Sequence, residues 1–381
     1  MTGPMTNSVR KRVVFLTGTR ADFGKLKSLM RTLQADEKFE VHIFVTGMHL
    51  LSKYGSTSEE VEKAGFRNIH KYINQNSSDR MDHILAKTVS GLSDYLQEIK
   101  PDLLVIHGDR VEALAGASVG ALNNVRVGHV EGGEVSGTID ESIRHAVSKL
   151  SHIHFVANDE ARNRLMQLGE PANSIYVIGS PDVDAINSPN LPTLDEVRDR
   201  YGMRFDRYGI VLFHPVTTEA EDLRRQTRIL VDDLVESKRN YVVIYPNNDH
   251  GTEVILAEYA KLDGHSNFRV YPSIRFEFFL TLMRNADVII GNSSAGVREA
   301  PHFGLPSVNI GSRQKNRVQH DAIVDCEPQP GAVLWAIDKA LKIRRTPTPL
   351  FGEGNSAQKF HELLRSPAFW DRPIQKIFVD M

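Results

Sequence analysis

Carboxylates recur in the first half of the chain at the points where apolar segments end. Three of them, Asp109, Glu131 and Asp140, follow successive segments of this kind. A single carboxylate in such a place is usually a helix cap or a solvated loop residue, and Asp140 would suit the first turn of a helix. Converging carboxylates, however, raise one another's pKa and make acid and base forms available together near neutral pH. With His107 and His129 close by in the sequence, the three predict acid–base catalysis.

Cationic and small hydroxyl residues at other segment ends could hold an anion. A glycine turn within residues 17–25 precedes Arg20 and Lys25, and the backbone N–H groups of the helix that starts there would point outward toward a phosphate. This segment matches neither the dinucleotide fingerprint nor the P-loop. In the second half, Ser293 and Ser294 open another helix after an apolar segment, which predicts a second phosphate site. Glu299 follows one turn later, where it could accept both hydroxyls of a ribose.

Other suggestive patterns have plainer explanations. His152 and His154 lack further metal ligands at suitable spacing, so we expect histidines satisfied within a sheet. The pair Asp182 and Asp184 resembles the metal site of some glycosyltransferases, but it falls in a predicted linker and is interpreted as a chance pattern. No nucleophile elbow or Cys–His arrangement appears. We therefore expect no metal and no cofactor.

The elements that must position these residues alternate between short apolar β-branched runs and amphipathic segments of helical length. A stretch rich in Pro, Asn and Ser, 179–208, divides them and reads as a linker with one short charged helix. The pattern predicts an α/β protein with two doubly wound, Rossmann-like domains that face each other across a cleft, with ligands outside the carboxyl ends of the strands. The predicted strands are 12–17, 41–45, 103–106, 125–130 and 153–156, then 210–213, 241–244, 268–271, 288–290 and 307–310.

Composition limits the partners of the chain. The 381 residues include 46 Lys and Arg against 48 Asp and Glu, so the formal net charge is only -2. This balance argues against general nucleic-acid or membrane binding. The single cysteine, Cys326, and the lack of a long apolar stretch behind the polar N-terminus favour a cytoplasmic protein.

Taken together, the motifs resemble the UDP-N-acetylglucosamine 2-epimerases, specifically the hydrolysing branch that opens sialic acid synthesis. The resemblance covers nearly the whole chain and rests on the order of four segments, 17–22, 45–49, 107–110 and 291–294. It implies the GT-B-like fold shared with a large class of glycosyltransferases, and a homodimer or homotetramer formed through first-domain helices. The implied domains are 11–180 with the catalytic carboxylates, 205–350 with the UDP site, and a C-terminal helix, 355–381, that packs back on the first domain.

The resemblance also implies roles for individual residues. The catalytic set would be Asp109, Glu131, Asp140 and His214. The diphosphate clamp would consist of Arg20, Arg110, Ser293, Ser294 and Arg313. Glu299 would bind the ribose, and the uracil pocket would contain Ile274 and Phe279. The site would also be lined by Lys25, His49 and Asn247.

The implied substrate is a UDP-sugar, and the implied reaction is elimination of UDP followed by hydration of the resulting glycal. Asp109 is the favoured base for the first step, while Glu131 and Asp140 are assigned to the second. Four alternatives stay open from the residues: a relative acting on a UDP-linked 2,4-diacetamido-trideoxy sugar, a non-hydrolysing epimerase, a glycosyltransferase of the same architecture, and a non-catalytic nucleotide-binding module.

Overall fold

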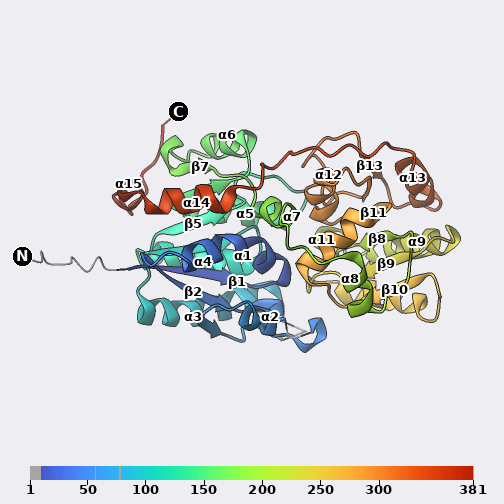
Figure 1. Cartoon of the computed structure of the whole chain (residues 1–381), viewed down its shortest axis with the longest axis horizontal. Helices are drawn as coiled ribbons and strands as arrows, with labels where there is room; N and C mark the ends of the chain where they lie inside the picture. The colour runs from blue at the N-terminus through green and yellow to red at the C-terminus, as the bar shows by residue number, and fades with distance from the viewer. Residues whose placement is uncertain (1–9, 56, 77–78, 381) are drawn as a thin grey trace, which may run out of the picture.

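Two parallel sheets, each covered by helices on both faces, make up the protein (Figure 1). The structure is a computed structural model that describes residues 10–55, 57–76 and 79–380. One sheet has seven strands in the order β3-β2-β1-β4-β5-β6-β7, and the other has six in the order β10-β9-β8-β11-β12-β13. All pairings are parallel within the described residues. The predicted fold class, two Rossmann-like α/β domains, is confirmed.

The central strands of the first sheet are buried on both faces, as expected for continuous apolar runs covered by helices. Its two cores lie on opposite faces, one around Phe15 and Val105 and the other around Val14 and Leu104. The strands are β1 (Lys11–Thr17), β2 (Phe39–Val45), β3 (Asn68–Lys71), β4 (Leu103–His107), β5 (Val127–Val130), β6 (Ile153–Val156) and β7 (Ile175–Val177). The helices are α1 (Arg20–Gln34), α2 (Ser58–Lys63), α3 (Met81–Ile99), α4 (Val111–Leu122), α5 (Ile139–Leu150) and α6 (Asp159–Gln167).

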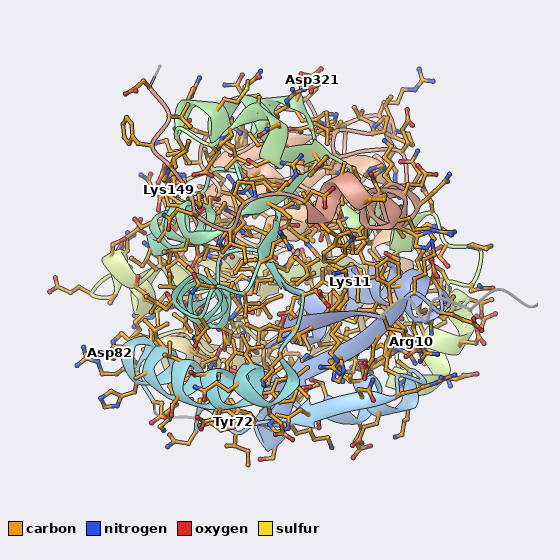
Figure 2. The ribbon with its side chains drawn as sticks, turned by 90° about the vertical axis from the view of Figure 1, so that its left-hand side faces the viewer. Arg10, Lys11, Tyr72, Asp82, Lys149 and Asp321 are labelled. Atoms are coloured by element: carbon orange, nitrogen blue, oxygen red, sulfur yellow. The ribbon has the colours of Figure 1, made fainter. Side chains whose placement is uncertain are left out.

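Charged side chains such as Asp82 on α3 and Lys149 on α5 lie on the outer surface of these helices (Figure 2). Among the described residues, no helix combines the length and the apolar character needed to cross a bilayer.

The second sheet repeats this construction. Its strands are β8 (Gly209–Leu212), β9 (Tyr241–Ile244), β10 (Phe268–Tyr271), β11 (Val288–Gly291), β12 (Ser307–Ile310) and β13 (Ile323–Cys326). Its helices are α9 (Leu223–Glu236), α10 (Thr252–Tyr259), α11 (Phe276–Asn285), α12 (Glu299–His302) and α13 (Ala332–Ala340). Short 3₁₀ helices in the two domains span Gly47–Leu50, Ser52–Tyr54, Ala172–Ser174, Thr217–Glu219, Ala260–Leu262 and Ser294–Gly296.

The chain passes between the domains twice, and we call these two stretches the crossing segments. The first contains α7 (Pro181–Ile186) and α8 (Leu194–Tyr201), and the second returns to α14 (Ser356–Arg365) and α15 (Pro367–Trp370). The backbone N–H of Ser180 donates to the carbonyl of Phe351 at 2.7 Å, so the two segments run side by side. Figure 1 shows α14 lying on the first domain, where Phe360 and Leu364 enter its core.

The aspartates at 182 and 184 lie in the helix α7 and have structural partners, whereas the sequence interpretation placed them in a linker. Asp182 is buried in α7, and its carboxylate lies 3.3 Å from the Lys25 ammonium. The Asp184 carboxylate accepts from the backbone N–H groups of Ser356 and Ala357 at 2.9 and 2.8 Å, which caps α14. Both side chains therefore help to join the domains.

Candidate active site

A cavity of about 250 Å³ lies between the carboxyl ends of the two sheets. This is the place where parallel α/β sheets bind ligands, because loops from neighbouring strands diverge there. Its wall contains every residue that the sequence analysis assigned to the site except His49: Arg20, Lys25, Asp109, Arg110, Glu131, Asp140, His214, Asn247, Ile274, Phe279, Ser293, Ser294, Glu299 and Arg313.

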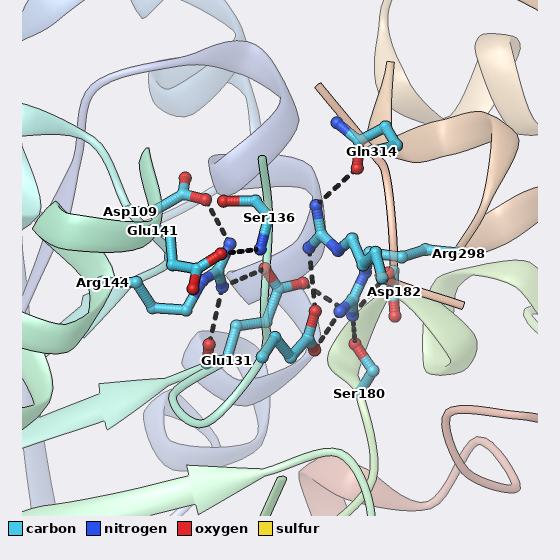
Figure 3. A network of polar contacts seen from close by, with 12 residues as sticks. Asp109, Glu131, Ser136, Glu141, Arg144, Ser180, Asp182, Arg298 and Gln314 are labelled. Atoms are coloured by element: carbon cyan, nitrogen blue, oxygen red, sulfur yellow. Dashed lines mark hydrogen bonds and ion pairs between the residues drawn. The ribbon is translucent and has the colours of Figure 1, made fainter. Parts of the chain in front are cut away.

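The three carboxylates that the sequence analysis singled out all come from the first domain. Asp109 follows β4, Glu131 follows β5, and Asp140 lies in the first turn of α5. The guanidinium of Arg144 binds the Asp109 carboxylate and donates to the Glu131 carbonyl at 2.7 Å, so one buried arginine fixes two of the three loops (Figure 3). Glu131 has φ 68°, a left-handed conformation that is costly for a side chain with a Cβ and that clusters at functional sites.

Asp109 and Asp140 are driven toward opposite protonation states. Burial acts to raise the pKa of Asp109, but the guanidinium groups of Arg144 and Arg317 outweigh it and hold that pKa below its usual value. Burial, followed by repulsion from Asp109, raises the pKa of Asp140 above its usual value despite Arg313 at 2.8 Å. Asp109 is therefore suited to accept a proton, and Asp140, which retains its proton more readily, is suited to donate one in the same site.

Glu131 is surrounded by cations. Its Oε1 lies 2.7 Å from Arg298, 3.3 Å from Lys25 and 3.4 Å from His107. Burial opposes ionisation, yet Arg298 and Lys25 hold the pKa of Glu131 well below its usual value. Lys25 is in turn held as a cation, because Glu131, Glu299 and Asp182 overcome its burial and raise its pKa.

His214 is buried and neutral. Burial, with Arg313 and Arg110 nearby, lowers its pKa well below its usual value. Its Nδ1 accepts the backbone N–H of Asn247 at 3.1 Å, which puts the ring proton on Nε2. The side chain of Asn292 bonds both the N–H and the carbonyl of His214, at 2.7 and 2.9 Å, and so ties the end of β8 to the end of β11. His214 can therefore offer a donor to the cavity but is not a protonated acid at rest.

Groups suited to a diphosphate gather where the two domains meet. Ser293 and Ser294 lie at the start of the turn after β11, and the Arg313 guanidinium donates to the Asn292 carbonyl at 3.2 Å beside them. Arg110 donates to the Asn248 side chain at 2.9 Å, and Arg20 donates to Ser273 at 2.6 Å. Both arginines start in the first domain and reach the second, so an anion between them would be bound by both halves.

The glycine turn at the start of α1 uses three of its backbone N–H groups internally, which narrows the set that the sequence analysis expected to face a phosphate. The Asp22 carboxylate accepts from the N–H groups of Gly18 and Thr19, at 3.0 and 3.2 Å, while the Thr19 hydroxyl accepts the Asp22 N–H at 3.1 Å. This reciprocal capping box keeps the N–H groups of Gly18, Thr19 and Asp22 bonded within the turn, so these three do not face a phosphate. Of this segment, the side chains of Arg20 and Lys25 remain available as cations.

His49 does not line the cavity, contrary to expectation. Its ring is fully buried, with Nε2 3.0 Å from the Thr17 hydroxyl and Nδ1 2.6 Å from the Thr57 hydroxyl. Burial lowers the pKa of His49 to about 4. The ring therefore supports the loop after β2 as a neutral group.

The far end of the cavity is less polar. Ile274 and Phe279 line it and belong to the second-domain core. Glu299 also lines the cavity, and its carboxylate is 3.1 Å from the Lys25 ammonium. The arrangement is that of a site with an apolar end in one domain, a cationic middle, and carboxylates in the other domain.

Comparison with known proteins agrees with this geometry. The sequence profile of UDP-N-acetylglucosamine 2-epimerases matches residues 31–365. The chain belongs to the UDP-N-acetylglucosamine 2-epimerase family.

Family members from several organisms align along most of the chain. A UDP-N-acetylglucosamine 2-epimerase of Neisseria meningitidis serogroup B is 44% identical over 97% of this chain and 99% of its own length. A hydrolyzing UDP-N,N'-diacetylbacillosamine 2-epimerase of Legionella pneumophila is 32% identical over 93% of this chain and 96% of its own. The crystal structure of the Methanocaldococcus jannaschii UDP-GlcNAc 2-epimerase, in complex with UDP-GlcNAc and UDP, superimposes with a TM-score of 0.78 at 24% identity, covering 93% of this chain and 99% of that one. That structural likeness supports the fold.

Several charged residues of this family member were missed by sequence reasoning. Arg144 and Arg317 lie on the cavity wall, and Arg298 and Glu134 lie just behind it. Arg317 donates to Glu134 at 2.8 Å. None of them follows a strand directly or belongs to a recognisable motif. Arg144 belongs to the amphipathic helix α5, and nothing in the sequence shows which carboxylates it meets.

Proposed function

We propose that the chain is a hydrolysing UDP-N-acetylglucosamine 2-epimerase, which converts its substrate and water into UDP and N-acetylmannosamine. The observation that carries the proposal is the pair Asp109 and Asp140, whose pKa values shift in opposite directions on one cavity wall. A reaction that removes a proton from one carbon face and returns it to the other needs such a pair, since one group cannot serve both faces.

The first step is elimination. The hydrogen on sugar C2 is not acidic, because no carbonyl adjoins it, so departure of UDP must make C1 cation-like before that hydrogen becomes removable. Asp109 takes the proton, the C2–H electron pair becomes the C1=C2 bond, and the C1–O electron pair leaves with UDP. Arg110, Arg313 and the Ser293–Ser294 turn stabilise the negative charge as it develops on the diphosphate.

The second step is hydration of the glycal. Asp140 delivers a proton to C2 from the opposite face, and the oxygen of water adds to C1, where it loses a proton and leaves the free sugar. The neutral His214 offers its Nε2–H as a hydrogen-bond donor to the leaving UDP or to the water.

The names of the relatives support the hydrolytic outcome. The Legionella and Campylobacter jejuni relatives, at 32% and 31% identity, are both named as hydrolyzing enzymes. The relatives from Neisseria meningitidis, Yersinia pestis and Methanocaldococcus jannaschii, at 44%, 24% and 24% identity, are named without that qualifier. The 44% identity to a relative named for UDP-N-acetylglucosamine favours that sugar.

A second candidate substrate follows from the same names. Two hydrolyzing relatives are named for UDP-N,N'-diacetylbacillosamine, a UDP-linked diacetamido sugar. Parallel assays on the two nucleotide sugars at equal concentration separate the candidates, and we expect a higher kcat/KM for UDP-N-acetylglucosamine.

The test of the reaction type is incubation of the protein with UDP-N-acetylglucosamine in deuterated water. We expect free UDP and N-acetylmannosamine that carries deuterium at C2, and no turnover by Asp109→Asn. UDP-N-acetylmannosamine without free UDP would instead identify a non-hydrolysing epimerase. Absence of turnover until a sugar acceptor is added would identify a glycosyltransferase.

A further inference from the structure

Arg298 is the most completely buried cation near the site, and the proposed reaction gives it no role. It belongs to the turn between β11 and α12, one residue before Glu299. Its Nη2 lies 2.7 Å from Glu131 Oε1 and donates to the Ser180 hydroxyl at 2.6 Å, while Nη1 binds Glu134 (Figure 3). A second-domain residue thus has its polar partners in the first domain and in a crossing segment.

The position of Arg298 between the crossing segments fixes it independently of ligand. Ser180 and Asp182 belong to the first crossing segment, and the Asp182 carboxylate is 3.3 Å from Nη2. The ring of Phe351, on the second crossing segment, lies 4.6 Å from the guanidinium carbon. Both crossing segments therefore hold the guanidinium in one place.

Arg298 does not belong to the cavity wall, whereas Glu131 does. The wall residue with which Arg298 forms an ion pair is Glu131, at 2.7 Å. We propose that Arg298 is a positioning residue that keeps Glu131 as a fixed carboxylate on the cavity wall and so leaves proton donation to Asp140. This inference rests on the proposed function, and it gives a structural reason why Asp140 rather than Glu131 is the donor in the hydration step.

The surroundings of Glu131 support this assignment. Basic side chains face it from three further elements, and the anions near it are themselves paired. The groups are Lys25 on α1, His107 at the end of β4, Arg144 on α5 with its Nη1 3.9 Å from Oε2, Asp109 after β4, Glu134 in the same loop and Asp182 on α7. If Glu131 took up a proton, the buried cations Arg298 and Lys25 would lose one of the anions with which they pair. Leaving buried charges without a partner costs free energy in a low-dielectric site. Asp140, by contrast, contacts one cation, Arg313, and is repelled by Asp109.

The residue type matters as well. Arg298 bridges Glu131 and Glu134 with different nitrogens of one planar group. A lysine ammonium is a point charge on a flexible stem and cannot match two carboxylates with the same rigidity. Arg298→Lys should therefore restore the charge near Glu131 with a looser geometry.

The direct test needs no substrate. The carboxyl carbon of Glu131 is followed by NMR in protein labelled at glutamate carboxyls, and its signal is assigned by its loss in Glu131→Gln. In the native protein we expect the ionised chemical shift to persist below the pH range in which an exposed glutamate takes up its proton. In Arg298→Met we expect the titration midpoint of Glu131 to rise by at least about one pH unit. In Arg298→Lys, which keeps the positive charge, the midpoint should return most of the way to its native value. An unchanged midpoint in Arg298→Met would overturn the proposal.

A second variant covers the case in which Arg298→Met does not fold. Arg298→Met combined with Glu134→Gln removes one buried cation and one buried anion, so the net charge of the cluster is kept. The Glu131 midpoint should still rise, by about half a pH unit, because its closest donor is gone. Glu134→Gln alone removes a repelling anion and should leave the midpoint level or lower it. A rise in Glu134→Gln equal to that in the double variant would refute the role of Arg298.

Turnover assays then separate this inference from the proposed function. Failure of the native protein to release UDP would refute the function, while the NMR titration would still decide the state of Glu131. With active protein, Arg298→Met should lower kcat and move the acidic limb of the pH profile upward, with the dissociation constant of UDP within about threefold of native because Arg298 lies outside the cavity wall. A weaker UDP affinity with an unchanged pH profile would indicate a purely structural role.

Discussion

Asp140→Asn should separate the two steps of the proposed reaction. In the native protein the Arg313 guanidinium donates to the Asp140 carboxylate at 2.8 Å, and the amide oxygen of asparagine can still accept this bond. The asparagine side chain cannot, however, release a proton to carbon. Loss of a general acid slows its step by about 10²- to 10⁴-fold, so hydration should slow by that factor. Elimination should continue, because Asp109 keeps its contact with Arg144 and loses a repelling neighbour.

The effect on nucleotide affinity can be bounded from the same contact. Replacing a charged acceptor of Arg313 by a neutral one weakens that pair by about 1 kcal/mol, which frees the guanidinium for the diphosphate and tightens UDP binding by at most about fivefold. Calorimetric titration with UDP measures this directly. The matched control is Glu141→Gln, one residue along α5, whose carboxylate accepts the Ser136 N–H at 2.9 Å outside the cavity wall.

The decisive assay counts both products in a single reaction. Free UDP is followed by a coupled enzyme assay, and the sugar products are followed by NMR. In Asp140→Asn we expect UDP to exceed N-acetylmannosamine, with the glycal accounting for the difference, whereas Asp109→Asn should release neither. Equal loss of UDP release in the two variants, or equal amounts of UDP and N-acetylmannosamine from Asp140→Asn, would refute the division of labour.

Three further predictions concern affinity and stability. Arg313→Met should weaken UDP binding by about 1.5 to 3 kcal/mol, measured by calorimetry, because a charge-assisted contact is lost; unchanged affinity would remove Arg313 from the clamp. Gly291→Ala should destabilise the protein by at least about 2 kcal/mol in urea unfolding, because its φ is 134° and its Cβ would lie 1.8 Å from the Leu212 carbonyl; a native midpoint would contradict this. Burial lowers the pKa of His129 from 6.5 to about 3, so the unfolded state binds a proton at a higher pH than the folded state does. The free energy of unfolding should therefore fall as the pH drops from 6.5 toward 3, by up to about 1.4 kcal/mol per pH unit. His129→Gln should show a shallower fall in the same measurement.

Much of the fold could be predicted because its central strands are apolar and β-branched. The strands that were missed are short: β3 (Asn68–Lys71) and β13 (Ile323–Cys326) have four residues each and include polar ones, and β7 (Ile175–Val177) has three. All three lie at sheet edges, where burial is less complete and the apolar pattern is shorter or weaker. The helix α7 was missed because Pro181, which suggested a linker, is at the first helical turn.

The site could be predicted as far as the strand ends reveal it. Residues directly after strands lie in the cavity wall because parallel topology brings those positions together, whatever the side chains do. The sequence does not show which side chain satisfies a local donor, and for that reason the carboxylate of Asp22 at the start of α1 was overlooked. Nor does it show pairings such as Arg144 with Asp109, since those depend on how helices pack over the sheet.

The two crossing segments limit how the domains can move. Because the backbone of Ser180 is bonded to that of Phe351, the halves share two adjacent tethers rather than one flexible string. A single connection would let the domains twist and slide relative to each other, whereas two adjacent connections leave mainly a hinge rotation about one axis. A protease nick in either tether should leave the halves attached, and deletion of the chain beyond residue 350 should free them to twist while stripping Phe360 from the first-domain core.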